Sequence, residues 1–179
     1  MESKLKIFLY LMLLISASAF SSDKREQIFN DYEGNFQVSS VIFAYHLVSF
    51  KGTQAASGEV VFELVHGEDY ENDIYKVSFF PDNPKLFPSI ESGFYPEKLN
   101  KIDLMNHEKV RKAVFTNDEW KAAIAKKQNY VSKRGTIQLQ DYKTSVECDS
   151  RQYYAKMLSF ESTDLEITYA KTREEMAGC

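Results

Sequence analysis

The sequence contains few of the residues from which recognisable catalytic and cofactor-binding motifs are built. Its 179 residues include two cysteines, three histidines and seven glycines. The glycines are scattered and form neither a GxGxxG fingerprint nor a phosphate-binding P-loop, and no GxSxG nucleophile motif occurs. No HExxH or CxxC spacing for zinc is present. We therefore assign no catalytic residue, no metal ligand and no cofactor.

Positive charge is outnumbered by negative charge. The chain has 22 lysines and arginines against 26 aspartates and glutamates, which gives a net charge of −4 at pH 7. Nucleic-acid-binding domains usually present a basic face, so we expect no nucleic acid as a partner. Hydrophobic residues make up 44% of the chain, which is enough for one domain with a packed core.

The longest apolar run lies at the N-terminus. Two lysines precede the apolar residues 7–15, and the small residues Ala17 and Ala19 follow. This layout predicts a secretory signal peptide over residues 1–19 and a single domain over residues 20–179. An uncleaved anchor is the alternative, but the run is shorter than the roughly 20 residues that cross a bilayer as a helix. We expect a periplasmic or secreted protein with no transmembrane segment after cleavage.

Export would give the two cysteines a structural role. Both Cys148 and Cys179 follow the expected cleavage site, and disulfides persist in the oxidising environment that exported proteins meet. We predict a disulfide between them. The alternatives are two separate thiols, an intermolecular link through Cys179, or a thiol–imidazole pair of Cys148 with His107.

Alternating apolar and polar residues predict a fold rich in β-strands. The stretches with this pattern are residues 36–50, 59–66, 74–80, 136–160 and 165–169. The first is apolar at both parities, which predicts a central strand covered on both faces. The fourth predicts two strands that meet at residues 148–151, with Tyr154 and Leu158 sharing a face of the second strand. Residues 51–58 and 132–135 are predicted to be turns.

One helix is clearly indicated. Thr116 and Glu119 have the spacing of a capping box, and Trp120 begins an apolar pattern at helical spacing. Residues 104–115 are ambiguous, with a short helix preferred. The expected fold class is α+β, an antiparallel sheet of about five to seven strands with one clear helix packed on it.

All four prolines fall within residues 81–96, among large apolar side chains. Such a segment either packs on the core or contacts a partner. If the protein binds another protein, the candidate contact residues are Leu86, Phe87, Ile90, Phe94 and Tyr95. The alternative is that these side chains close one end of the core.

Other polar groups offer weaker signals. The acidic loop at residues 68–73 lacks the spacing of an EF-hand, so we interpret it as a solvated hairpin loop and leave calcium binding open. His46 and His66 lie in predicted strands, where a structural histidine is the expected role. If those strands pair, the two imidazoles could approach each other as a metal or acid–base pair.

Compartment, composition and the lack of a catalytic motif together favour a non-enzymatic function. The leading hypothesis is an exported protein-binding domain, such as an inhibitor or immunity-type factor, whose partner is another envelope or extracellular protein. One alternative is a β-rich pocket protein for a small apolar or sugar ligand. Another is an envelope hydrolase whose site is assembled from scattered residues.

Overall fold

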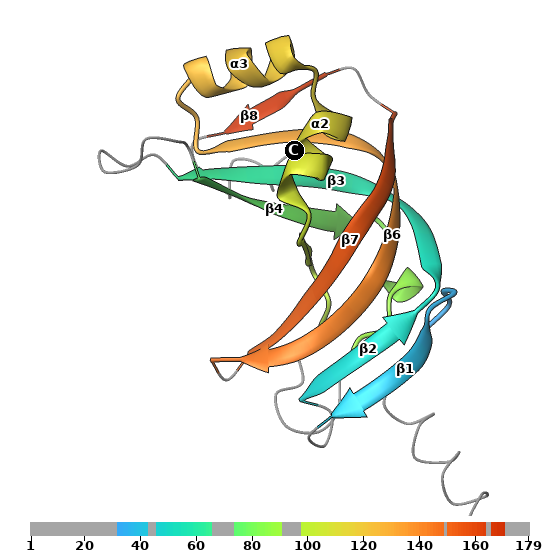
Figure 1. The fold of residues 1–179 in the computed structure, drawn as a ribbon. Helices are drawn as coiled ribbons and strands as arrows, with labels where there is room; N and C mark the ends of the chain where they lie inside the picture. Colours follow the sequence, from blue (N-terminus) through green and yellow to red (C-terminus); the bar gives the residue numbers. More distant parts are fainter. Residues whose placement is uncertain are drawn as a thin grey trace, which may run out of the picture.

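The computed structural model describes residues 32–42, 46–65, 74–90, 98–148, 150–163 and 166–170. Its strands are β1 (Gln37–Ile42), β2 (Leu47–Lys51), β3 (Thr53–Val65), β4 (Ile74–Pro81), β5 (Ile102–Leu104), β6 (Tyr130–Glu147), β7 (Ser150–Ser162) and β8 (Thr168–Ala170). The helices are α2 (His107–Val114) and α3 (Asn117–Ala125), with a short 3-10 turn, η1 (Pro84–Leu86) (Figure 1). The α+β, β-rich class is confirmed, although these ranges hold eight strands and two α-helices. None of the helices in these ranges has both the length and the hydropathy that crossing a membrane requires.

Strand β6 organises the sheet. Its 18 residues pair with β2, β3, β7 and β8. The strand order is β1-β2-β6-β3-β4-β5-β7, and β7 returns to pair with β6. Strands β3, β4, β5, β7 and β6 therefore form a closed ring of pairings, which β1 and β2 extend from β6 as a two-stranded wing. The wing lies at the end of the molecule opposite to α2 and α3 (Figure 1).

A bulge in β6 allows this strand to pair with strands of both the ring and the wing. The register with β7 shifts between Gln140 and Lys143, and Asp141 adopts the left-handed region at φ 52°. Because the shift changes the alternation, Leu139 and Tyr142 both face the core although they are three residues apart. Bulges also bend the strand that carries them, which fits the strong curvature of β6 (Figure 1).

The prediction of a central strand over residues 36–50 is wrong. The segment forms an antiparallel hairpin of β1 and β2, and β1 lies at the edge of the sheet. Apolar residues occur at both odd and even positions of this segment for two reasons. The chain reverses between β1 and β2, and the register of β1 shifts between Val38 and Ser40. Val48 and Phe50 of β2 face the core, whereas β1 is mostly exposed.

The turn predicted at residues 132–135 is wrong, and the turn predicted at residues 51–58 is much shorter than expected, because β3 begins at Thr53 and β6 is continuous through residues 132–135. Only Gly52, at φ 108°, turns the chain before β3 begins. Gly58 and Gly135 lie directly opposite each other in the β3–β6 ladder. A Cβ atom at Gly58 would clash with the carbonyl oxygen of Phe80, and one at Gly135 would clash with the ring of Phe160. These glycines permit close approach within continuous strands.

The two strands predicted over residues 136–160 are confirmed as β6 and β7, but the inward face of β7 differs. Tyr153, Ala155 and Met157 are buried, and Tyr154 and Leu158 are half-buried. Within the closed ring of strands, Tyr153 and every second residue after it point inward, toward the side chains of the opposite strands.

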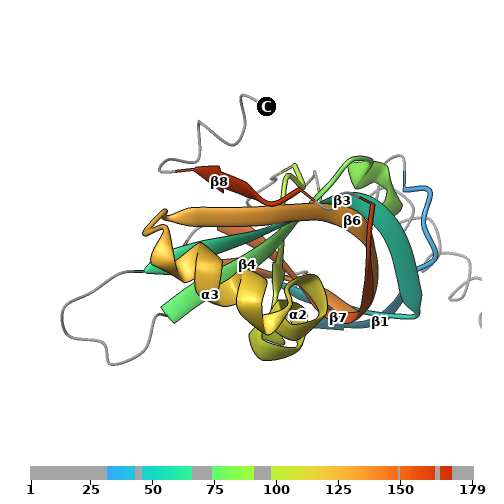
Figure 2. The same cartoon turned by 90° about the horizontal axis from the view of Figure 1, so that it is seen from above.

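The helices close one end of the ring. Figure 2 shows both on the same side of β3 and β6. Trp120 of α3 packs against Phe62 and Tyr75, with ring centroids 5.4 and 5.1 Å apart. The predicted capping box is present: Thr116 accepts a hydrogen bond from the Glu119 backbone, and the Glu119 carboxylate accepts one from the Thr116 backbone.

Candidate functional site

The proline-rich segment contributes to the core. The exposed fraction is 1% for both Phe87 and Ile90. The Phe87 ring centroid lies 5.8 Å from that of Tyr142, whose hydroxyl donates a hydrogen bond of 2.7 Å to the carbonyl of Pro88. The backbone N–H of Ile90 donates to the Tyr153 hydroxyl at 3.3 Å. Phe87 and Ile90 therefore take the alternative role of core residues, and neither is accessible to a partner here.

Of the other three candidate contact residues in this segment, one is less deeply buried and two lie outside the described residues. Leu86 is half-buried against the core at the end of η1. Phe94 and Tyr95 lie outside the described residues, so their role in partner binding stays a prediction.

Cys148 is exposed in the β6–β7 turn, at φ 48°, and forms no disulfide with another described residue. Cys179 lies outside the described residues, and the disulfide between them stays a prediction. His107 begins α2 beside Asn106, whose side chain makes two hydrogen bonds, of 2.8 and 2.9 Å, to the backbone of Met157. Met157 is seven residues along β7 from the turn, on the order of 20 Å. The thiol and the imidazole therefore do not form a pair.

Of the remaining metal and acid–base candidates, only His46 is described, so the pairing of His46 with His66 stays a prediction. His46 is exposed in the turn before β2. His66 and the acidic loop at residues 68–73 are outside the described ranges. Among the described residues, no group of three or more histidine, cysteine, aspartate or glutamate side chains is arranged to hold a metal ion.

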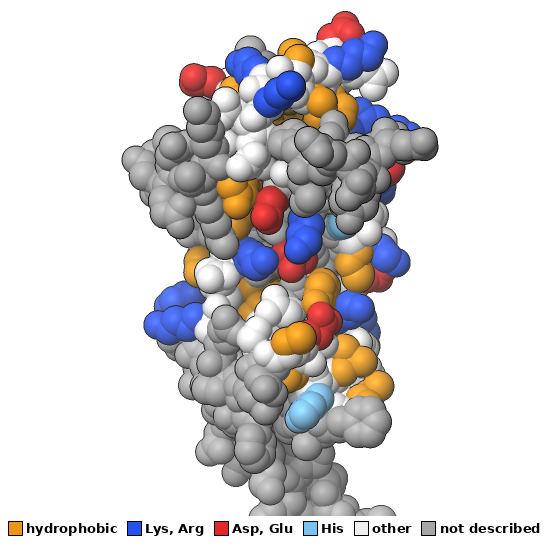
Figure 3. Space-filling model, turned by 90° about the vertical axis from the view of Figure 1, so that its left-hand side faces the viewer, with side chains coloured by type: hydrophobic (Ala, Val, Ile, Leu, Met, Phe, Trp, Pro, Cys, Tyr) orange, Lys and Arg blue, Asp and Glu red, His pale blue; other side chains and the backbone are white. Residues whose placement is uncertain are grey.

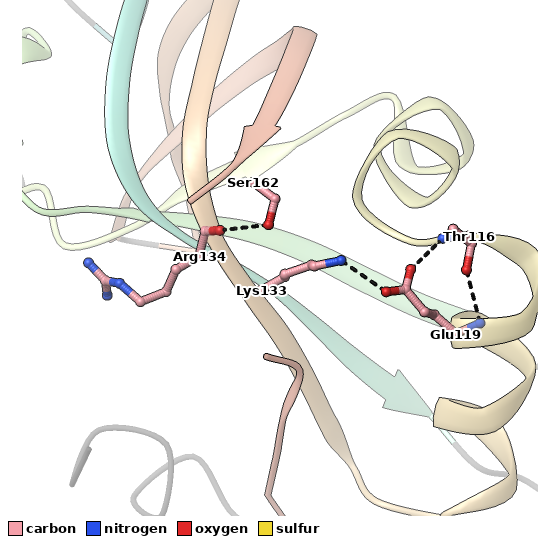
Figure 4. A network of polar contacts seen from close by, with 5 residues as sticks. All are labelled: Thr116, Glu119, Lys133, Arg134 and Ser162. Carbon is pink, nitrogen blue, oxygen red and sulfur yellow. Dashed lines mark hydrogen bonds and ion pairs between the residues drawn. The ribbon is translucent and has the colours of Figure 1, made fainter. Parts of the chain in front are cut away.

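One nearly buried ion pair is structural. Lys133 of β6 is 7% exposed, and its Nζ lies 3.1 Å from Glu119 Oε1 of α3 (Figure 4). The other carboxylate oxygen of Glu119 accepts the Thr116 backbone N–H at 2.7 Å. This backbone hydrogen bond, assisted by the ammonium of Lys133, lowers the pKa of the Glu119 carboxyl. Each carboxylate oxygen has a partner within the protein, which indicates a contact that docks α3 on the sheet.

The open edge of β1 is the accessible feature that best fits binding. Among the described strands, β1 pairs with β2 on one side and with none on the other. Val41 and Ile42 on this strand are 42% and 43% exposed. Figure 3 shows hydrophobic side chains gathered in the lower part of the molecule's left-hand face, at the height of the β1–β2 wing.

Val41 is the exposed end of a row of buried side chains. The register places Val41 opposite Val48, Val48 opposite Thr144, and Thr144 opposite Tyr153. Residues directly opposite each other in a sheet point to the same face. The three inner members of the row are at most 4% exposed. The core layer of the wing thus continues to the edge of the sheet and ends there without cover from the described chain.

A groove of about 640 Å³ lies where the β1–β2 wing meets the bulge of β6. The side chains that line it are mostly polar and include Ser39, Ser49, Lys51, Gln140, Lys143 and the exposed Met105. Ser39 is the lining residue that belongs to β1. The sequence alone did not indicate either feature, because residues 36–50 read as a covered central strand. In comparisons with known proteins, no family model, curated protein or solved structure matches the chain.

Proposed function

We propose that this protein is an exported protein-binding domain whose partner adds an extended segment to the open edge of β1. The observation that carries the proposal is the pair of exposed aliphatic side chains, Val41 and Ile42, on an edge strand that pairs with β2 on one side and with no described strand on the other. Edge strands present a row of unpaired backbone groups, and several peptide-binding domains use such an edge to add a partner's strand.

The row that ends at Val41 supports this mode of binding. A partner strand beside β1 would place one side chain next to Val41 and another, on the opposite face, next to Ile42. Covering the exposed parts of these two residues contributes about 1 kcal/mol each. Backbone hydrogen bonds add about 1 kcal/mol apiece. Because the cost of association offsets much of this gain, a stable complex needs further contact, for which the adjoining groove offers room.

The bulge in β1 limits how the edge can be used. The register shift between Val38 and Ser40 interrupts the ladder, and bulges of this kind discourage long edge-to-edge pairing. The regular part of the edge is therefore short, from Ser40 to Ile42. A short partner segment fits this edge better than a long strand of an aggregating chain.

The class of partner follows from the expected export of the chain. A periplasmic or secreted domain of this kind meets envelope or extracellular proteins, and an inhibitor or immunity-type factor is one example. A second candidate, a binder of a small polar ligand such as a sugar, is favoured by the hydroxyl, amide and ammonium groups that line the groove.

The test compares two edge variants with a variant of the groove. Val41→Glu and Ile42→Glu place a charge on the edge, whereas Met105→Glu changes another exposed hydrophobic residue that lies in the groove and outside β1. The partner is first captured from an extract of the native host by cross-linking and identified by mass spectrometry. Its Kd for each purified variant is then measured, together with the thermal midpoint.

We expect each edge variant to weaken the complex at least about tenfold with little change in thermal midpoint. Unchanged Kd values for both edge variants would refute the edge as the binding site. If only Met105→Glu weakens binding, the groove is the site. A homodimer that the edge variants dissociate would assign the edge to self-association.

A further inference from the structure

The groove where the β1–β2 wing meets the bulge of β6 results from a change of neighbour along β6. Strand β3 pairs with β6 as far as Thr53, which lies opposite Gln140. Strand β2 pairs with β6 from Lys143 onward, beginning at Ser49. Because β7 pairs with β6 over both stretches, β2 and β3 lie on the same edge of β6. The gap between the two ladders, where Gly52 turns the chain from β2 into β3, forms part of the groove.

The charged side chains that line this groove are not balanced. They are Lys51, Lys143 and Asp141. Asp141 Oδ2 lies 3.0 Å from Nζ of Lys156, which is outside the lining, so the charge of Asp141 is offset there. In the described ranges, no carboxylate lies within ion-pair distance of Lys51 or Lys143. The groove is therefore positive, although the whole chain carries a net charge of −4.

Lys51 and Lys143 project from the same face of the sheet. Lys143 lies opposite Ser49, and Lys51 follows Ser49 by two positions in β2, where side chains alternate. Diagonal neighbours of this kind are about 7–8 Å apart, within reach of long side chains. The ammonium of Lys143 lies 5.3 Å from the centroid of the Tyr154 ring, a contact that positions the charge without neutralising it. One anionic group can therefore contact both lysines.

The neutral polar side chains of the groove are available to a ligand as well. They belong to Ser39, Ser49, Thr53 and Gln140. None of the four forms a side-chain hydrogen bond with another described residue. Hydroxyl and carboxamide groups both donate and accept hydrogen bonds, which matches the hydroxyl groups of a sugar. The volume of about 640 Å³ lies within the range of small-ligand pockets.

The composition of the lining indicates the class of ligand. The excess positive charge favours an anionic group. A lone inorganic anion needs fewer hydrogen-bonding partners than the four neutral polar side chains provide. Among the large hydrophobic side chains that are exposed in the described ranges, only Met105 lines the groove, which is too little apolar surface for a lipid. A sugar that carries a carboxylate fits both the charge and the hydrogen-bonding groups.

We propose that this groove binds an acidic saccharide, a sugar unit that carries a carboxylate. Lys51 and Lys143 bind the carboxylate through charge-assisted hydrogen bonds, and the hydroxyl and carboxamide groups of the lining bind the sugar hydroxyls. The thioether of Met105 packs on the carbon–hydrogen groups of the sugar ring. This ligand belongs to the second candidate function, on which the proposal rests, and it needs no partner at the β1 edge.

The test is titration calorimetry of the purified exported protein at constant ionic strength. The probes are digalacturonate, its neutral dimethyl ester and the acidic peptide triglutamate. The variants Lys51→Gln and Lys143→Gln each remove one cation of the groove. Lys109→Gln is the matched control, because Lys109 is an exposed lysine of α2 outside the groove and its loss changes the net charge equally.

We expect digalacturonate to bind with a Kd of about 1 mM or below, and the dimethyl ester to bind at least about tenfold more weakly because it lacks the charge. Lys51→Gln and Lys143→Gln should each weaken the binding of digalacturonate about tenfold, and Lys109→Gln should leave it unchanged. Thermal midpoints check that the variants fold. Lys51 is exposed, so its variant should fold even if the loss of the contact between Lys143 and Tyr154 is destabilising.

A further variant tests the sign of the charge from the opposite direction. Asp141→Asn removes the carboxylate of the described lining, and asparagine, like aspartate, tolerates the left-handed backbone of this position. The change should tighten the binding of digalacturonate, since the groove becomes more positive. Weaker binding by this variant would contradict the role assigned to charge.

Four results would overturn the proposal in different ways. Equal binding of digalacturonate and its ester would refute the preference for an acid and leave a neutral sugar as the ligand. Binding of triglutamate but not of digalacturonate would assign the groove to an acidic peptide. If no probe binds, the second candidate function fails together with the acidic saccharide, whereas the β1 edge is tested separately by the Kd of the captured partner. Equal effects of Lys51→Gln and Lys109→Gln would place the binding outside the groove.

Discussion

Replacing Glu119 by alanine should destabilise the protein more than replacing its buried partner, Lys133, by methionine. The two side chains form an ion pair of 3.1 Å in which Lys133 is 7% and Glu119 30% exposed. The ammonium of Lys133 also lies 5.9 Å from the centroid of the Phe115 ring. Removal of the carboxylate would leave a nearly buried positive charge, whereas methionine can occupy the same space without a charge.

The magnitudes follow from the separate contacts. Loss of the capping box costs about 1 kcal/mol. Removing one partner of a buried ion pair costs roughly 3–5 kcal/mol of stability. Because Glu119 is partly exposed, we expect about 2–3 kcal/mol for this pair. Glu119→Ala should therefore cost about 3–4 kcal/mol, Thr116→Ala about 1 kcal/mol, and Lys133→Met less than about 1.5 kcal/mol. The double variant Glu119→Ala with Lys133→Met should be more stable than Glu119→Ala alone.

The assay is urea unfolding followed by the fluorescence of Trp120, the one tryptophan of the chain, which lies in α3. Far-UV circular dichroism on the same samples checks that the transition is two-state. Equal costs for Glu119→Ala and Lys133→Met, with additive effects in the double variant, would refute the reasoning. That result would mean that the ammonium of Lys133 reaches water when its partner is removed.

The same pair predicts a dependence on pH. The pKa of Glu119 is lowered in the folded protein, first by the backbone hydrogen bond from Thr116 and further by Lys133. A carboxyl with a lowered folded pKa stabilises the fold above its unfolded pKa of about 4.3, and this contribution is lost as the pH falls through the folded pKa. The difference in unfolding free energy between the wild type and Glu119→Gln should therefore shrink as the pH falls below about 4.

The remaining predictions concern the core, the cysteines and the N-terminus. Phe87→Ala should lower the free energy of unfolding by about 3–5 kcal/mol, as measured in urea, and a loss below about 1 kcal/mol would contradict its placement in the core. Serine at Cys148 or Cys179 should cost roughly 2–5 kcal/mol if they form a disulfide, and two titratable thiols in denatured, natively exported protein would exclude it. Intact-mass measurement of exported protein should place the mature N-terminus within two residues of Phe20, and retention of residues 1–19 would contradict the signal peptide.

Patterns between residues close in sequence determined several elements of this protein. The spacing of Thr116 and Glu119 predicted the start of α3, because a capping box needs only four consecutive residues. Alternation within residues 74–80 predicted β4, and the strands on either side of the 148–151 turn were predicted in the same way. The β-rich α+β class followed from these local signals.

Only the tertiary structure decided which strand is an edge and which face is buried. The apolar residues of 36–50 fit a covered central strand as well as an edge hairpin, since the difference depends on where β6 pairs. Phe87 fitted a partner-binding loop as well as the core until its packing against Tyr142 was known. Burial depends on contacts between residues distant in sequence, and local periodicity does not encode those contacts.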